Sequence, residues 1–147
     1  QGEIVDRTPD DFSIAYRHAG LKASTDEIFL AAWLRFPAGT AALARAQIRA
    51  LLEKRIASQP LRLPNAGSVF RNPPGDYAAR LIEAAGLKGR EEGSARVSEK
   101  HANFIVNPGG RASASAIESL IGRIQAEVRE QFGVELVREV RILGTKT

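Results

Sequence analysis

A proline- and glycine-rich stretch in the middle of the chain sets the strongest limit on its fold. Residues 58–77, SQPLRLPNAGSVFRNPPGDY, hold four of the seven prolines in the 147-residue sequence. Proline donates no backbone hydrogen bond and disrupts helices and central strands. We therefore expect an irregular loop here, with a domain boundary at its start between residues 58 and 59.

The first half of the chain predicts two strands and a helix. FSIAYR at residues 12–17 is a short strand candidate, and EIFLAAWLRF at residues 27–36 has the continuous apolar character of a strand covered on both faces. Thr40 then caps a helix through Ile56. One stripe of that helix is apolar, formed by Ala44, Ile48, Leu51, Leu52 and Ile56.

The second half predicts a small α+β layer of loop, helix, two strands, helix and strand. The first helix runs over residues 76–85 and stops at Gly86, and the two strands lie near residues 95–97 and 103–106. A capping box of Ser115 and Glu118 begins the long helix, which Gly133 ends. Its apolar stripe consists of Ile117, Leu120, Ile121, Ile124 and Val128.

Composition excludes several classes of site. The sequence has no cysteine, which rules out disulfides and thiolate chemistry, and its two histidines disfavour a protein-bound zinc site. No apolar run reaches the roughly 20 residues of a membrane-spanning helix. The net charge of +4 comes from 16 arginines and 5 lysines scattered among acidic residues. Arginine suits carboxylates and phosphates, so the charge favours an anionic ligand modestly.

The segment PNAGSVFRNP, residues 64–73, carries the most unusual set of small and polar groups. Ala66 and Gly67 are small enough for the backbone to approach a ligand closely. Ser68 then offers a hydroxyl and Asn72 an amide. On residue types alone, the segment is equally well a turn cluster in which these groups satisfy local backbone. Ser68 has no evident His–Asp relay, which argues against an ordinary serine hydrolase.

The closing segment VELVREVRIL predicts a strand over residues 134–143. Strand alternation would place Glu139 and Arg141 about 7 Å apart on one face. Two interpretations stay open. The pair either meets neighbouring strands on a solvated face, or a rigid strand aims a carboxylate and a guanidinium into one anion site.

Three further polar groups have weaker signals. Tyr16 can pack across a strand pair and Arg17 can be an ordinary surface charge. Lys100 and His101 can present polar groups at the entrance to a strand, or can be ordinary loop residues. Gly86-Leu87-Lys88-Gly89 fits the GxxG loop with which KH modules clamp a nucleic-acid backbone. A helix C-cap explains Gly86 equally well.

Taken together, these segments resemble the UDP-N-acetylenolpyruvoylglucosamine reductase family, also called UDP-N-acetylmuramate dehydrogenases. The similarity follows family order over nearly the whole chain, and the absence of an extra substrate loop implies the shorter, type II branch. The motifs that carry it are AYRHAGL (15–21), R-x3-QP (55–60), PNAGSVFRNP (64–73), AARLIEAAGLKG (78–89), GSARVSEKHANFIVN (93–107) and FGVELVREVRILG (132–144).

The resemblance implies an α+β protein in two regions. Residues 1–58 would be the C-terminal remnant of a FAD-binding domain, and residues 59–147 a small α+β substrate-binding domain. The family holds the flavin pyrophosphate with an earlier Gly-rich segment, and nothing in this sequence resembles it. The sequence also opens on Gln1 rather than Met. We therefore expect the C-terminal portion of a longer enzyme, inactive by itself.

The resemblance also implies a reaction and its residues. NADPH would reduce FAD, and UDP-N-acetylglucosamine enolpyruvate would become UDP-N-acetylmuramate, a cytoplasmic step toward peptidoglycan. Ser68 would donate a proton, while Glu139 and Arg17 would bind and polarise the substrate carboxyl. The remaining implied contacts are Asn72, Arg141, Lys100 and His101 for the substrate and Tyr16 with Arg17 on the cofactor side. This reading requires Ser68 and Glu139 to share one pocket.

Two positions depart from the family pattern, and two other functions remain open. Ala19 replaces a usual serine, which would remove a flavin-side hydroxyl, and Val137 replaces the first glutamate of the terminal motif. The alternative is an isolated, non-catalytic module that binds an anionic UDP-sugar without flavin. A KH-like nucleic-acid binder is the weaker third reading. The leading interpretation implies no metal, nucleic-acid or membrane partner and leaves the oligomeric state open.

Overall fold

The structure is a computed structural model of the 147-residue chain, and it describes residues 2–16, 18–23 and 26–144. The chain divides into two compact units, residues 1–39 and 40–147. This division places the first α-helix with the second unit, whereas the sequence suggested a boundary between residues 58 and 59. The assignment of the two parts to flavin and substrate binding stays a prediction.

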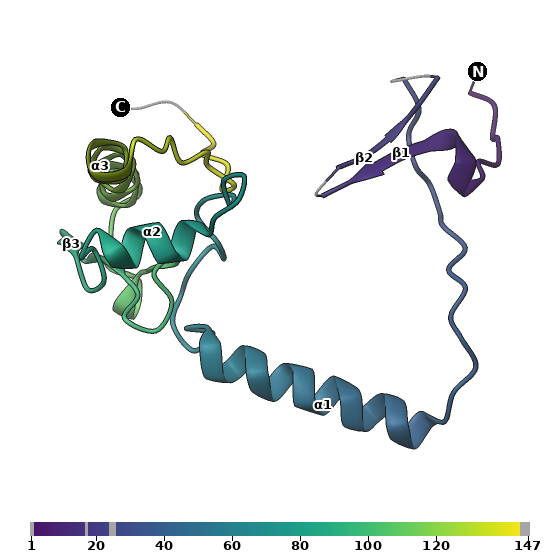
Figure 1. The fold of residues 1–147 in the computed structure, drawn as a ribbon, viewed down its shortest axis with the longest axis horizontal. Helices are drawn as coiled ribbons and strands as arrows, with labels where there is room; N and C mark the ends of the chain where they lie inside the picture. Colours follow the sequence, from purple (N-terminus) through teal and green to yellow (C-terminus); the bar gives the residue numbers. More distant parts are fainter. Residues whose placement is uncertain (1, 17, 24–25, 145–147) are drawn as a thin grey trace. The chain divides into compact units, whose positions relative to one another are not determined.

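The first unit contains one small hairpin (Figure 1). A 3-10 turn at Pro9–Asp11 leads into strand β1 (Phe12–Ala15), which pairs antiparallel with β2 (His18–Leu21). The turn is fixed by the Asp11 carboxylate, which accepts the Thr8 backbone N–H at 2.7 Å. The strand predicted from FSIAYR is thus confirmed over residues 12–15.

The buried strand predicted at residues 27–36 is wrong. These residues form no regular element, and most of their apolar side chains are exposed, with Trp33 fully so. The local contacts are made by side chains: Arg7 donates to the Glu27 carboxylate at 2.6 Å, and the Phe12 and Phe29 rings lie 5.7 Å apart. A strand needs a neighbour for its backbone groups. No described strand pairs with this segment.

Helix α1 (Ala41–Ser58) confirms the predicted first helix. The Thr40 hydroxyl caps it by accepting the Leu43 backbone N–H at 3.4 Å. Its apolar stripe is not packed, however, because every residue of the helix is exposed; Leu51, for example, is 68% exposed.

The second unit is built around a three-stranded antiparallel sheet and two helices. Strands β3 (Glu91–Glu92), β4 (Ala95–Val97) and β5 (Ile105–Val106) lie in the order β3-β4-β5. Helix α2 (Ala78–Ala84) contacts α3 (Ala114–Phe132), and α3 also packs on β3 and β4 (Figure 1). The predicted order of loop, helix, two strands and helix is confirmed up to α3. Strand β3 is an additional strand that the sequence did not predict.

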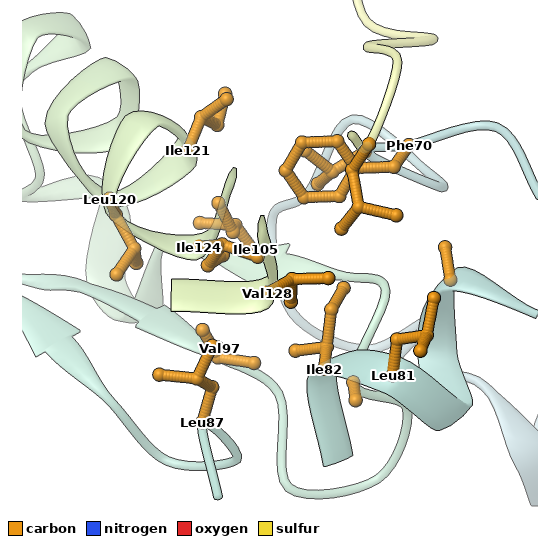
Figure 2. Close-up of a cluster of buried hydrophobic side chains, with 14 of the residues drawn as sticks. Phe70, Leu81, Ile82, Leu87, Val97, Ile105, Leu120, Ile121, Ile124 and Val128 are labelled. Carbon is orange, nitrogen blue, oxygen red and sulfur yellow. The ribbon is translucent and has the colours of Figure 1, made fainter. Parts of the chain in front are cut away.

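The core of the second unit lies between α2, α3 and the sheet. Figure 2 shows side chains from these elements converging, together with Phe70 from the central loop. The predicted apolar stripe of α3 is confirmed, since Leu120 and Ile124 are each at most 1% exposed. Helix α2 contributes Leu81 and Ile82, which are equally buried. Burying such side chains stabilises a fold by about 1.5–3 kcal/mol each.

The long helix begins earlier than predicted. Ser113, rather than Ser115, is its N-cap, and the Ser113 hydroxyl accepts the Ala116 backbone N–H at 3.1 Å. Ser115 and Glu118 therefore form no capping box, because Ser115 already lies inside the first turn. Gly133 ends the helix as predicted, with φ of 67°, a left-handed conformation that glycine adopts without a Cβ clash.

The closing strand predicted over residues 134–143 is also wrong as a regular element. Only Arg138 forms a β-bridge, antiparallel to Phe70. The Val69 carbonyl accepts two successive N–H groups, from Glu139 at 2.8 Å and from Val140 at 3.4 Å. Two residues facing one is the pattern of a β-bulge. Strand alternation is interrupted there, so it no longer places Arg141 beside Glu139.

Helix α2 is entered through a charged turn that offers a direct test. The Asp76 carboxylate accepts the Tyr77 backbone N–H at 2.6 Å and the Arg80 Nε–H at 2.7 Å. The Arg80 guanidinium, and then the Tyr77 N–H, lower the pKa of Asp76 to about 2. A lowered folded-state pKa stabilises the fold above the ordinary value of 3.8, and that contribution is lost as the pH falls toward 2.

We therefore expect NMR titration of the Asp76 carboxyl to show a midpoint near 2 in the intact chain. Arg80→Met should raise the midpoint toward 3.8 by removing the ion pair. Arg123→Met, which removes a similar pair with Glu127 on α3, serves as the control and should leave the Asp76 titration unchanged. A midpoint near 3.8 in the unsubstituted chain would contradict the assignment.

None of the helices in the described part of the chain is long and apolar enough to cross a lipid bilayer.

Candidate functional site

The loop that carries Ser68 lies between two segments that are distant in the sequence. On one side, the Val69 N–H donates to the Asn103 carbonyl at 2.9 Å. On the other, the Arg71 N–H donates to the Val137 carbonyl at 2.9 Å, and the Glu139 N–H donates to the Val69 carbonyl at 2.8 Å. The fold thus joins three of these motifs, residues 64–73, 93–107 and 132–144, through backbone hydrogen bonds.

The turn before Ser68 is organised by an asparagine. The Asn65 Oδ1 accepts the Gly67 N–H at 2.9 Å, while its Nδ2 donates to the Leu63 carbonyl at 2.7 Å. Gly67 has φ of 83°, which disfavours any side chain at that position. A Cβ there would meet no atom within 4 Å, so conformation rather than space requires the glycine. Ser68 follows this turn and is half-buried.

Glu139 contributes a carboxyl group to the segment that pairs with the Ser68 loop. Its side chain is half-buried, and its Oε2 is shielded from solvent. Because Glu139 faces Val69 across a backbone hydrogen bond, their Cα atoms are within roughly 6 Å of each other. Ser68 directly precedes Val69, so the backbones of Ser68 and Glu139 belong to one hydrogen-bonded unit.

Asn72 and Arg141 occupy different environments. The Asn72 Oδ1 accepts the Ala78 backbone N–H at 3.1 Å, at the start of α2. Its NH₂ group is therefore the part suited to a ligand, as a donor to anion oxygens. Arg141 is exposed beyond the bulge, where the chain has no regular pairing. The backbone does not place Arg141 next to Glu139.

Lys100 contacts a helix end. Its Nζ donates to the Ile56 carbonyl in the last turn of α1 at 2.6 Å, a favourable position for a cation. Lys100 also lines a cavity of about 620 Å³ with residues of α1 and the loop that follows it, and neither Ser68 nor Glu139 lines this cavity. The structure thus brings Lys100 to α1 rather than to the Ser68 loop.

His101 lies beside the sheet. Its Nδ1 accepts the Asn103 backbone N–H at 3.3 Å, and its ring meets Phe104 edge-on at 4.9 Å. Burial, reinforced by the nearby Lys88 charge, lowers the pKa of His101 below 6.5. A neutral ring suits the acceptor role of Nδ1.

The remaining candidates lie in or near the glycine turns and the hairpin. The Lys88 ammonium of the GxxG segment pairs with the Glu83 carboxylate at 2.6 Å. Tyr16 follows β1 in the first unit and is 71% exposed. Arg17 lies outside the described residues, so its predicted role stays a prediction.

Asn103 is the residue that sequence reasoning missed. The sequence places it only at the start of the predicted strand near residues 103–106, yet it is 4% exposed and holds the Ser68 loop through its side chain as well as its backbone. The available signal was an amide within the apolar run ANFIV, because a buried asparagine requires dedicated hydrogen-bond partners.

Comparisons with known proteins identify relatives of this chain. Residues 59–143 match the family model "UDP-N-acetylenolpyruvoylglucosamine reductase, C-terminal domain". The UDP-N-acetylenolpyruvoylglucosamine reductase of Thiobacillus denitrificans is 56% identical over 146 residues, which are 99% of this chain and 45% of that protein. The reductase of Legionella pneumophila strain Paris is 53% identical, over 98% of this chain and 47% of that protein. The chain thus spans about half the length of these relatives.

A solved structure agrees with the sequence relatives. The crystal structure of the UDP-N-acetylenolpyruvylglucosamine reductase (MurB) of Thermus caldophilus matches with a TM-score of 0.55 and 39% sequence identity. The match covers 67% of this chain and 34% of that one.

Proposed function

This chain belongs to the UDP-N-acetylenolpyruvoylglucosamine reductase family, and on that premise we propose that it forms the substrate-binding part of such an enzyme. The whole enzyme would reduce UDP-N-acetylglucosamine enolpyruvate to UDP-N-acetylmuramate in peptidoglycan synthesis. Its place would be the cytoplasm, where UDP-sugars and NADPH occur. The observation that carries the proposal is the backbone pairing of the Ser68 loop with the Glu139 segment.

FAD and NADPH enter the proposal as the implied source of hydride. The described residues do not form a flavin site by themselves. Tyr16 is the one described side chain predicted to face the cofactor, and it lies on a largely exposed hairpin with no glycine-rich phosphate loop in the first unit. The part of the reaction assigned to this chain is therefore the handling of the substrate.

The charge that develops during the reaction explains the need for Glu139 and Ser68. Adding hydride to the enolpyruvyl double bond builds an enolate-like charge toward the substrate carboxylate, which preorganised donors must stabilise. Glu139 serves this role when protonated, because a carboxylic acid can donate a hydrogen bond to the oxyanion. The Ser68 Oγ–H then gives its proton to the carbon next to the carboxylate.

The diphosphate end of the substrate is assigned to Asn72 and Arg141. The Asn72 oxygen accepts the Ala78 N–H at 3.1 Å, and the NH₂ group is the donor that we assign to the ligand. An exposed guanidinium such as that of Arg141 can swing onto a phosphate as a bidentate donor. Lys100 and His101 stay candidates on the substrate side.

Asn72→Asp tests this assignment in the isolated chain. The substitution keeps an oxygen for the Ala78 N–H but replaces the donor with a negative charge, so we expect affinity for UDP-N-acetylglucosamine to fall at least about tenfold. Isothermal titration calorimetry measures the change. Asn107→Asp adds the same charge at an asparagine that bonds Ala112 and should leave the affinity unaltered. Equal losses in both variants would contradict a specific role for Asn72.

Flavin content and turnover separate the enzyme from the isolated binding module. We expect the 147-residue chain to bind the UDP-sugar and to show no flavin absorbance. A full-length reductase that contains the chain should be yellow and should oxidise NADPH when given the enolpyruvyl substrate. A full-length protein with bound flavin and no such turnover would refute the proposed activity.

A further inference from the structure

Asn103 forms an amide clasp on the backbone of Phe70. The Asn103 Oδ1 accepts the Phe70 N–H at 2.9 Å, and its Nδ2 donates to the Phe70 carbonyl at 2.8 Å. The side chain thus completes both hydrogen bonds of one residue, as a neighbouring strand would. Asn103 is 4% exposed, so water does not compete for these bonds.

The clasp lies at the centre of the candidate site. The Asn103 carbonyl also accepts the Val69 N–H, while the Val69 carbonyl accepts the Glu139 N–H on the opposite side. One asparagine therefore contacts the two residues that follow Ser68, and one of those residues holds Glu139. A change at Asn103 reaches Ser68 through the backbone of Val69 rather than through any side-chain contact with the ligand.

We propose that Asn103 is a positioning residue of the reductase site, which holds the Ser68 loop against the Glu139 segment. This inference rests on the proposed function. Residues 64–73 contain two prolines and one glycine and form no regular element, so they cannot fix the Ser68 hydroxyl by themselves. The buried clasp supplies the rigidity that a proton donor needs, since a displacement of about 1 Å can slow catalysis about 100-fold.

The chemistry of the clasp requires an amide of this length. Leucine at this position would fill the space but leave the buried N–H and C=O of Phe70 without partners, at a cost for each. An aspartate carboxylate would accept the Phe70 N–H but oppose the Phe70 carbonyl oxygen with another acceptor. Both Asn103→Leu and Asn103→Asp should therefore release the loop, and Asn103→Asp preserves the shape of the side chain.

Asn107 provides a matched control within the same chain. Its Oδ1 accepts the Ala112 N–H at 2.8 Å, and its Nδ2 donates to the Ala112 carbonyl at 3.3 Å. This second clasp closes the turn before α3 and does not hold the residues that follow Ser68. A loss of function that arises from any broken asparagine clasp would appear equally in Asn107→Leu.

The test measures turnover in a full-length reductase that contains this chain. Asn103→Leu and Asn103→Asp should lower kcat about 100-fold, with unaltered flavin absorbance and a KM within about threefold of the original. Asn107→Leu should leave kcat within about twofold. In a Ser68→Ala background, Asn103→Leu should lower kcat by less than about threefold more, because the group that it positions is already gone.

Each other outcome overturns a defined statement. An unsubstituted full-length reductase without turnover overturns the proposed function and this inference with it. If the unsubstituted reductase turns over normally, two results overturn the positioning role alone. One is an equal loss of kcat in the Asn103 and Asn107 variants, and the other is a full loss from Asn103→Leu in the Ser68→Ala background. Hydrogen exchange in the unsubstituted chain gives a test that needs no variant, because a Phe70 N–H that exchanges as fast as exposed loop amides rules out the clasp.

Discussion

Replacing Ser68 with alanine in a full-length reductase that contains this chain is expected to lower turnover by about 100- to 10,000-fold, the range attributed to a positioned proton donor. Flavin should remain bound, and substrate affinity should change little. The expectation follows from the position of Ser68, after the Gly67 turn and directly before Val69, whose carbonyl accepts the Glu139 N–H. Loss of the hydroxyl removes the proton donor without altering that backbone.

Steady-state turnover, single-turnover flavin reoxidation and flavin absorbance together separate the proton transfer from cofactor loss. Ser94→Ala, an equal change at an exposed residue of the turn between β3 and β4, should leave all three measurements unaltered. Turnover that survives Ser68→Ala would remove Ser68 from the mechanism, and the Asn103 clasp would then have no catalytic group to position.

The sequence predicted elements well where local chemistry alone decides them. Thr40 and Gly133 mark helix ends through their own hydroxyl and backbone conformation, and the buried stripe around Leu120 follows from helical periodicity. These features need no knowledge of the rest of the fold, so a single sequence contains them.

The predictions that failed depended on partners. Residues 27–36 have the composition of a buried strand, yet composition does not supply a neighbouring strand, and no described strand pairs with them. At the closing segment, Glu139 and Val140 share the single Val69 carbonyl, and this bulge breaks the alternation that had placed Arg141 beside Glu139. Burial of Asn103 likewise depends on a loop 33 residues away along the chain.

The candidate site lies between these two cases. The motifs around Ser68 and Glu139 were visible as residue types, and the resemblance gave them roles, but only the fold joins their backbones. Lys100 was also visible as a residue type, and only the fold shows that its ammonium donates to the last turn of α1; its implied substrate contact stays a prediction.

The packing of the second unit leads to the prediction with the largest effect on stability. Leu120 on α3 is 0% exposed within the core, whereas Leu51 on α1 is 68% exposed. Leu120→Ala should therefore lower the free energy of unfolding of the 147-residue chain by about 2–5 kcal/mol, from lost burial and the cavity that remains. Leu51→Ala removes the same atoms from a solvent-exposed helix and should change it by less than about 0.5 kcal/mol.

Urea unfolding followed by circular dichroism measures both differences, provided that the slope of the transition is the same for the two variants. The comparison holds chemistry constant and varies only burial, since each substitution converts a helical leucine to alanine. A cost at Leu51 equal to that at Leu120 would mean that the apolar stripe of α1 is covered in solution, and that α1 belongs to the core. A small cost at both positions would instead contradict the core formed by α2, α3 and the sheet, on which the placement of the Ser68 loop depends.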